Sequence, residues 1–361
     1  MPASPSVARA VNDRTALLLL RDGPMTAGEL AGRTGLSRPT IAELVRRLGD
    51  AGLVTVVGES ASGRRGPNAA LYGIVRDRAH VAALDLRTDS VSVVVGDLLG
   101  TVLAEASVAV EPSNAVSRTV ALVRDTGSSP HAVGIGVPGL VDPATGEVRG
   151  VPPRWHSGAM GELRRRLPGQ LLVENETNVA ALAEHRVGNA RDRDTFALLW
   201  LGAGTGAAFV LGGALHRGAS GGAGELGYLP LGDNGFHPLA SAAAVVALGA
   251  EHGLTGSGPA MIRTAVASGA GSFLDAVAER IAVGAAAVTA VLDPGCVVLG
   301  GELGLAGGTE LADRVAARLA ARTPIATEVR PSTLGGEAVL RGALLTACEA
   351  AQNDLFGRPS W

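Results

Sequence analysis

A helical pattern over residues 37–51 is the first place in this sequence where residue types and spacing suggest chemistry. Apolar side chains recur at helical spacing, which predicts one buried face, and they are Ile41, Leu44, Val45 and Leu48. The other side carries arginines, whose guanidinium groups bind phosphates and the edges of guanine bases. The candidate DNA-contacting residues here are Ser37, Arg38, Pro39, Thr40, Arg46 and Arg47. We expect the residues near the helix start to approach base edges and the later arginines to meet phosphates.

Two further helical patterns precede this segment and must position it. The first covers about Val7 to Arg21, and the second opens at Thr26, where Glu29 three residues on completes a capping box. Gly35 ends the second helix, and Ser37 is a good N-cap for the third. Small residues before this turn and an apolar residue after it are typical of a helix-turn-helix, with residues 37–51 as recognition helix. An ordinary three-helix bundle with a solvated arginine face is the alternative.

Two strand patterns follow, Leu53 to Val57 and Ala69 to Ile74, and they predict a two-stranded wing. The segment between them is rich in glycine and carries Arg64 and Arg65. Wing tips of this kind lie against phosphates or in the minor groove. We therefore add Arg64 and Arg65 to the candidate DNA contacts, with a disordered linker as the alternative.

Composition limits the class of protein. The chain has 361 residues, 47% hydrophobic and 18% charged, with 51 glycines, which predicts a soluble α/β protein with two or three cores. The net charge of -3 hides an asymmetry, because residues 1–72 carry nine arginines and six acids, a net +3, and the remainder carries -6. Cys296 and Cys348 lie in apolar segments and predict no disulfide framework. No apolar run is long enough to span a membrane, so we expect a cytoplasmic location.

The remaining three hundred residues contain the same pattern of strands and turns twice. His80 to Leu86 and Val91 to Gly96 predict a hairpin, and Thr195 to Leu201 and Ala207 to Leu211 predict another about 117 positions later. Each is followed by mixed helix and strand. This predicts two similar lobes facing a cleft, the duplicated actin-like or hexokinase-like (ribonuclease H-like) architecture.

Several segments, in order along the whole chain, resemble the family of repressors, open reading frames and kinases, the ROK family, whose regulators carry a winged helix-turn-helix. The matching segments are Leu84 to Leu86, Gly134 to Gly139, Glu174 to Asn178, Gly202 to Gly206, Gly224 to Gly227, Leu292 to Pro294 and Val297 to Gly301. One glycine-rich turn alone would be a weak signal, whereas this many segments in order is a specific one.

The resemblance also shows where the chain departs from the family's kinases. Their first phosphate turn has two glycines and a threonine, where this chain has Arg87, Thr88 and Asp89. Arginine fills the space and Asp89 repels phosphate. The kinases' general base is an aspartate, and Glu176 stands in its place with a longer side chain. We therefore expect no enzyme activity.

What the resemblance implies for ligand binding is a partial sugar site. The candidate ligand-binding residues are Gly139, Asn175, Glu176, Glu225 and His237. Glu225 matches a sugar-contacting glutamate and His237 takes the place of another. A loop histidine near solvent, and a helix-start carboxylate at Glu176, are the alternatives. The family's zinc-binding histidine falls at Tyr228 and its three cysteines have no counterpart, so we expect no metal and no cofactor.

The sequence therefore predicts an α/β protein with a winged helix-turn-helix over residues 1–75 and a two-lobed sensor and oligomerisation domain over residues 76–361. Its expected partners are double-stranded DNA with an inverted-repeat operator, a sugar or sugar-derived effector, and a second copy in a homodimer or homotetramer, with no membrane. The expected function is transcription regulation of carbohydrate genes, most simply repression. The alternatives are an active sugar kinase with a fused DNA-binding module, and a ligand-free regulator whose second domain only oligomerises.

Overall fold

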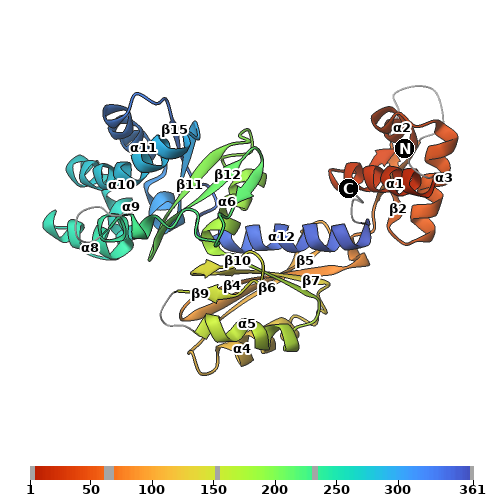
Figure 1. Ribbon diagram of the computed structural model, residues 1–361, viewed down its shortest axis with the longest axis horizontal. Helices are drawn as coiled ribbons and strands as arrows, with labels where there is room; N and C mark the ends of the chain where they lie inside the picture. The colour runs from red at the N-terminus through yellow and green to blue at the C-terminus, as the bar shows by residue number, and fades with distance from the viewer. Residues whose placement is uncertain (1–4, 61–68, 151–154, 230–234, 358–361) are drawn as a thin grey trace.

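The first three helices form a small unit at one end of the molecule (Figure 1). The computed structural model describes residues 5–60, 69–150, 155–229 and 235–357. The helices are α1 (Pro5–Arg21), α2 (Ala27–Thr34) and α3 (Arg38–Asp50). The expected capping box is confirmed, because Thr26 N donates to Glu29 Oε2 at 2.7 Å and Glu29 N donates to Thr26 Oγ1 at 3.2 Å. Gly35, at φ 71°, lets the chain turn sharply between α2 and α3.

The wing is a hairpin of β2 (Val54–Ser60) and β3 (Ala69–Ile74), as expected. A third strand, β1 (Met25–Thr26), pairs antiparallel with β3 and was not expected, since two residues leave no alternating pattern to read. Arg64 and Arg65 lie outside the described residues.

The rest of the chain forms two five-stranded sheets with the same connectivity. The first has the order β10-β7-β4-β5-β6 and the second β13-β12-β11-β14-β15, so in each sheet the third, second, first, fourth and fifth strands are neighbours. The first-sheet strands are β4 (His80–Leu86), β5 (Ser90–Asp97), β6 (Val102–Ala109), β7 (Ala132–Val137) and β10 (Gln170–Asn175). Those of the second are β11 (Phe196–Leu201), β12 (Thr205–Leu211), β13 (Ala214–His216), β14 (Cys296–Gly300) and β15 (Glu328–Pro331). The predicted duplication is confirmed, and we name the two halves lobe 1 and lobe 2.

Helices cover both faces of each sheet (Figure 1). On the outer faces lie α4 (Ala115–Asp125) and α5 (Trp155–Arg166) in lobe 1, and α8 (Ala242–Glu251), α9 (Gly258–Ser268), α10 (Gly271–Leu292) and α11 (Gly301–Arg322) in lobe 2. On the inner faces lie α6 (Glu176–Arg186) and α12 (Ala338–Leu355). The short elements are β8 (Leu140–Val141), β9 (Val148–Arg149), α7 (His237–Ala240), η1 (Arg76–Arg78), η2 (Leu226–Tyr228) and η3 (Gly335–Glu337).

The last helix, α12, joins the three parts of the molecule. It packs on α6 so closely that a Cβ on Gly342 would lie 1.7 Å from Val179 O, so only glycine fits there. At its other end Arg14 of α1 donates to Asn353 Oδ1 at 2.7 Å and to Gly357 O. One hydrophobic cluster holds Leu17 and Leu20 of α1 together with the α12 residues Leu344 and Ala347.

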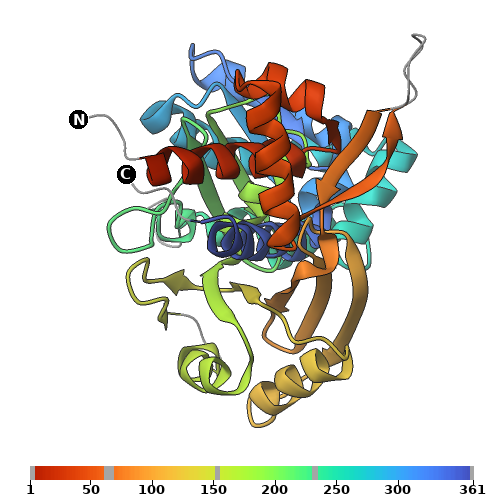
Figure 2. The same cartoon turned by 90° about the vertical axis from the view of Figure 1, so that its right-hand side faces the viewer.

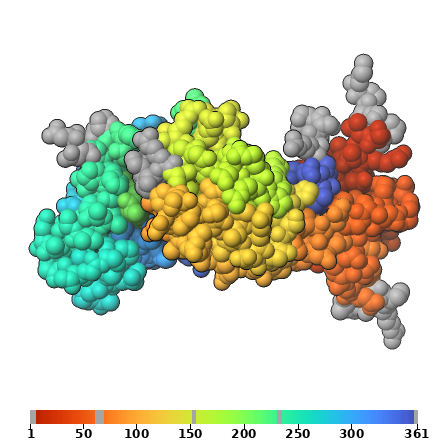
Figure 3. All heavy atoms as spheres, turned by 90° about the horizontal axis from the view of Figure 1, so that it is seen from below, coloured from red at the N-terminus to blue at the C-terminus, as the bar shows by residue number. Residues whose placement is uncertain are grey.

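Seen from below, the winged helix, lobe 1 and lobe 2 follow one another in a row, and part of the blue C-terminal segment lies beside the red helices (Figure 3). Turned by 90°, the dark blue helix is seen nearly end-on beneath α1 (Figure 2). Among the described residues, no helix has the length and apolar character needed to cross a membrane.

Candidate functional sites

The start of α3 faces outward. Ser37 caps the helix by accepting from Thr40 N at 3.4 Å, and Pro39 occupies the first turn, where a missing N–H does no harm. Ser37, Arg38, Pro39 and Thr40 are all exposed, whereas the apolar side of the helix is buried as predicted. Within the described part of the chain, Arg38 has no hydrogen-bond or ion-pair partner of its own. Its guanidinium group is therefore available to an external anion or base.

The two later arginines of α3 differ from each other. Arg46 is exposed over 68% of its side chain and pairs with Asp50 one turn on, at 2.9 Å. Arg47 reaches back to α1, where its Nη2 and Nε donate to the two carboxylate oxygens of Asp13 at 2.5 and 3.2 Å. Hydrogen bonding to Asp13 raises the pKa of Arg47. Arg47 thus ties the recognition helix α3 to α1. This ion pair competes with the DNA contact expected for Arg47.

A cavity of about 700 Å³ opens between the two lobes and brings together the ligand-binding candidates of the sequence. Gly139, Asn175, Glu176, Glu225 and His237 all line it. Sequence reasoning left out other lining residues, of which Trp200, Thr205 and Glu302 come from lobe 2. Glu302 directly follows the matching segment that ends at Gly301. This position could have marked Glu302 as a candidate from the sequence.

Asn175 holds one wall of the cavity in place. Its Oδ1 caps α6 by accepting from Thr177 N at 2.8 Å and Asn178 N at 3.2 Å. Its Nδ2 donates to Gly139 O at 2.9 Å. Gly139 adopts φ 108°, a conformation that side-chain-bearing residues rarely take. Asn175 is therefore largely committed to the protein, with one N–H left for a ligand.

Glu176 and Glu225 have uncommitted carboxylates. Among the residues that the structure describes, neither side chain has a hydrogen-bond or ion-pair partner. Burial, together with the negative charges of Asp85, Glu302 and Glu225, raises the pKa of Glu176 to about 7. Burial also raises the pKa of Glu225. Glu176 is the first residue of α6, but the helix dipole does not outweigh these effects.

Arg87 links the lobes at the edge of this cavity. Its Nε donates to Asp85 Oδ2 of lobe 1 at 2.9 Å, and its Nη1 donates to Glu302 Oε1 of lobe 2 at 3.1 Å. Burial disfavours the Arg87 charge, but the two carboxylates outweigh burial and raise its pKa. The turn that carries Arg87 is held from below, because Trp155 Nε1 donates to Thr88 O at 3.2 Å.

His237 lies on the lobe 2 side, with its Nδ1 3.5 Å from Thr205 Oγ1. Tyr228, at the family's zinc-ligand position, is exposed over 74% of its surface. Within the described ranges, no group of three or more potential ligands is arranged to hold a metal ion.

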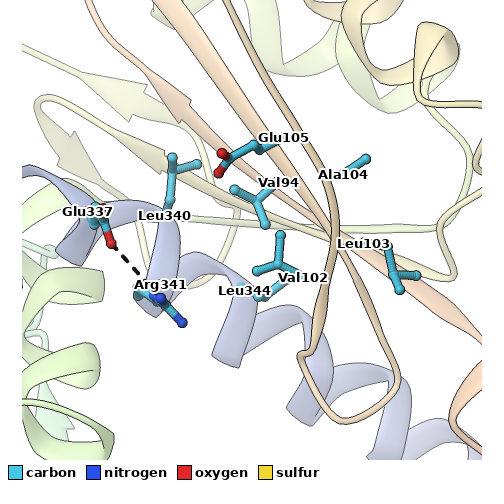
Figure 4. A pocket seen from close by; sticks show the side chains of 9 residues that line it. All are labelled: Val94, Val102, Leu103, Ala104, Glu105, Glu337, Leu340, Arg341 and Leu344. Atoms are coloured by element: carbon cyan, nitrogen blue, oxygen red, sulfur yellow. Dashed lines mark ion pairs between the residues drawn. The ribbon is translucent and has the colours of Figure 1, made fainter.

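A second hollow lies away from these residues, between the edge strand β6 and α12 (Figure 4). Its lining is mainly apolar, with Val102, Leu103 and Leu340 among its residues, and the ion pair of Glu337 and Arg341 lies at one side. It contains none of the residues singled out from the sequence.

Comparison with known proteins adds to this geometry. Residues 81–350 match the profile described as ROK family, and residues 17–55 match the profile described as winged helix-turn-helix DNA-binding. The bifunctional enzyme NanE/NanK of Brucella melitensis is 36% identical over 170 residues, which cover 45% of this chain and 32% of that protein. The xylose repressor of Bacillus subtilis is 25% identical over 247 residues, 64% of each protein. The chain thus spans about a third to two thirds of the length of these relatives.

Among solved structures, a ROK family transcriptional regulator, titled a homolog of the E. coli MLC protein, superposes with a TM-score of 0.78. The match covers 97% of this chain and 98% of that one at 20% identity. At that identity the similarity establishes the fold alone, a winged helix followed by the two-lobed domain.

Proposed function

The chain belongs to the ROK family, and from that premise we propose that it is a DNA-binding transcription regulator of carbohydrate genes, acting as a repressor. Residues 1–75 bind the operator. Residues 76–361 sense a sugar or sugar derivative and hold two or four copies together. The similarity to a xylose repressor supports this assignment.

The observation that carries the proposal is the physical link between the recognition helix and the cleft. Helix α6 begins at Glu176 in the cavity wall and packs backbone to backbone on α12. Helix α12 then shares a hydrophobic cluster and the hydrogen bonds of Arg14 with α1, and Arg47 ties α3 to α1 through Asp13. A ligand that binds one lobe arrangement better than the other shifts the population of that arrangement. Through these rigid contacts the shift changes the placement of α3.

The surroundings of Arg87 support a sensor without phosphate transfer. A nucleotide's phosphates need open backbone amides or free cations. Here Arg87 occupies the turn, and Asp85 and Glu302 already neutralise it. Glu302 also fills the space next to Gly202, where a Cβ would lie 2.4 Å from its Oε2. Glu176, at the position of the family's general base, carries a raised pKa, and within the described residues its carboxylate forms no hydrogen bond or ion pair.

On DNA the protein acts as a homodimer or homotetramer that places two α3 helices on an inverted repeat. The half-sites are then about one helical turn, or a multiple of it, apart. In each copy Arg38 and its neighbours read base edges, and Arg46 with the wing arginines meets phosphates.

Selection from a random DNA pool on the immobilised full-length protein tests the function. We expect enrichment of an inverted repeat, and fluorescence anisotropy of that fragment should then change when sugars are added. Equal affinity for all DNA at every salt concentration would contradict the proposal. ATP turnover above background in the presence of hexoses or hexosamines would instead support an active kinase.

A further inference from the structure

The cleft between the lobes carries an excess of negative charge. Its charged lining residues are Arg87, Asp89, Glu176, Glu225 and Glu302. Four of these five are acids, and Arg87 is the one guanidinium among the lining residues that the structure describes. A ligand in this cavity therefore meets carboxylates from both lobes.

The positive charge of Arg87 is already shared with two carboxylates, because its Nε bonds Asp85 and its Nη1 bonds Glu302. Asp85 itself is only 3% exposed, and its Oδ1 has no hydrogen-bond partner among the described residues. The Asp85, Arg87 and Glu302 group thus still carries a net negative charge beside the cavity, with a buried acceptor atom left unsatisfied.

Glu176 and Glu225 add two carboxylates that have no hydrogen-bond donor among the residues of the described ranges. Burying like charges close together without a cation is costly, whereas a hydrogen bond between charged partners is among the strongest that proteins form. The rest of the lining offers neutral hydrogen-bonding groups suited to hydroxyls, among them Thr88, Thr177 and Thr205. A phosphate or carboxylate on the ligand would bring a further negative charge to a cavity in which the one guanidinium among the described lining residues is already paired with two carboxylates.

We propose that the cleft takes a polyhydroxylated ligand that carries an ammonium group, an amino sugar with a free amine, and rejects phosphorylated and carboxylated sugars. This inference rests on the proposed function, because it assigns the effector of the same cleft. The ammonium group lies between Glu176 and Glu225 and donates to both, and the ligand's hydroxyl groups bind the neutral lining residues.

Binding of such a cation also moves a proton. The charged groups that face Glu176 are Asp85 and Arg87 from lobe 1, and Glu225 and Glu302 from lobe 2. Because burial and neighbouring carboxylates raise the pKa of Glu176 to about 7, part of the population is protonated at neutral pH. An ammonium ion beside the carboxylate lowers this pKa, so the complex releases a proton.

Isothermal titration calorimetry of the full-length protein tests the order of affinities. The probes are matched sets on the glucose, galactose and mannose scaffolds, each with the 2-amino sugar, the neutral sugar, the 6-phosphate and the uronic acid. On at least one scaffold we expect the amino sugar to bind about tenfold or more tightly than the neutral sugar, a difference typical of a charged hydrogen bond. The two anionic forms should show no binding. Buffers of different ionisation enthalpy should report proton release for the amino sugar.

Glu225→Gln keeps the shape and the acceptor oxygen but removes the charge. This substitution should weaken binding of the amino sugar about tenfold and binding of the neutral sugar about twofold or less. The matched control is Glu251→Gln, on exposed lobe 2 surface outside the cavity, which should change neither affinity. Thermal melting of both variants verifies that they remain folded.

Tightest binding by a neutral or anionic sugar, or no binding by any of the amino sugars, would overturn this inference. Retention of the selected DNA fragment is measured on the same preparation without sugar. If DNA binding is intact but a neutral or anionic sugar binds most tightly, the ligand assignment is rejected and the proposed function stands. If the amino sugar binds most tightly but the protein shows no sequence-specific DNA binding, the proposed function is rejected instead.

Discussion

Arg38 on α3 and Arg87 in the cleft carry the same guanidinium group in opposite surroundings. Arg38 is exposed and has no partner in the described structure. Arg87 lies between two carboxylates, one from each lobe, at 2.9 and 3.1 Å. The first charge is available to a polyanion, and the second is already neutralised inside the protein.

This difference shows that neighbouring charges, more than residue type, determine what an arginine does. Arg47 illustrates the intermediate case, since it shares α3 with Arg38 but pairs with Asp13. A basic residue count over residues 1–72 therefore overstates the positive charge offered to DNA.

Removing the free arginine should have the largest effect. We expect Arg38→Ala to weaken binding of the selected operator about 10–100-fold, which corresponds to about 1.4–2.8 kcal/mol for the loss of a base-edge contact. Fluorescence anisotropy measures this. Arg124→Ala, which removes another exposed arginine, from lobe 1, should leave operator affinity unchanged. Equal losses in both variants would mean that general charge, and not the position of Arg38, determines binding.

On the cleft side, Glu176→Gln removes a carboxylate that the cavity disfavours. The folded pKa of about 7 lies above the ordinary value of 4.5, so the folded state binds the proton more tightly between these pH values. Wild-type stability should thus fall as pH rises from 4.5 through 7, and the variant should lack this loss. We expect Glu176→Gln to be more stable than wild type by about 1–2 kcal/mol at pH 8. Urea denaturation between pH 4.5 and 8 measures the difference, which should vanish at the acid end.

Arg47, the arginine of α3 that pairs with Asp13, should affect the stability of the fold more than it affects DNA binding. Arg47→Ala breaks a half-buried pair with Asp13, and we expect a loss of about 1 kcal/mol in the free energy of unfolding. Asp13→Asn should cause a similar loss, and the double variant should cost less than the sum of the two. Additive losses would show that the pair does not stabilise the helix.

The smallest effect is expected at Arg46, which is exposed and, among the described residues, pairs only with Asp50. Arg46→Ala should leave stability within about 0.5 kcal/mol. It should weaken operator binding roughly threefold and lower the slope of log affinity against log salt by about one, as for a single phosphate contact. An unchanged slope would place Arg46 away from the DNA.

Much of the winged helix could be predicted because its signals are local. The Thr26 and Glu29 capping box, the turn at Gly35 and the N-cap at Ser37 each act within four residues, and all are present. The repeated hairpins also gave the duplicated lobes, since alternation and glycine turns are read over short stretches. The five ligand-binding candidates line one cavity, and all of them except His237 lie within the segments that resemble the family.

The long-range pairings had no such signal. Arg87 and Glu302 are 215 positions apart, and Asp13 and Arg47 are 34 apart. The sequence predicts that Arg87 fills the phosphate turn, but not that a carboxylate of the other lobe meets it there. Nor does it show that α12 returns to lobe 1, because a single apolar helix is compatible with packing on either sheet.

The packing of α12 near the N-terminal helix α1 affects the order in which contacts form during synthesis. Its residues 338–355 supply Leu344 and Ala347 to the cluster that also holds Leu17 and Leu20. Domains usually fold in order of synthesis, N-terminal first, but Leu17 and Leu20 pack in a cluster with residues that leave the ribosome more than three hundred positions later. The contacts that fix the orientation of α1 against the rest of the molecule therefore form only after residues 338–355 have left the ribosome.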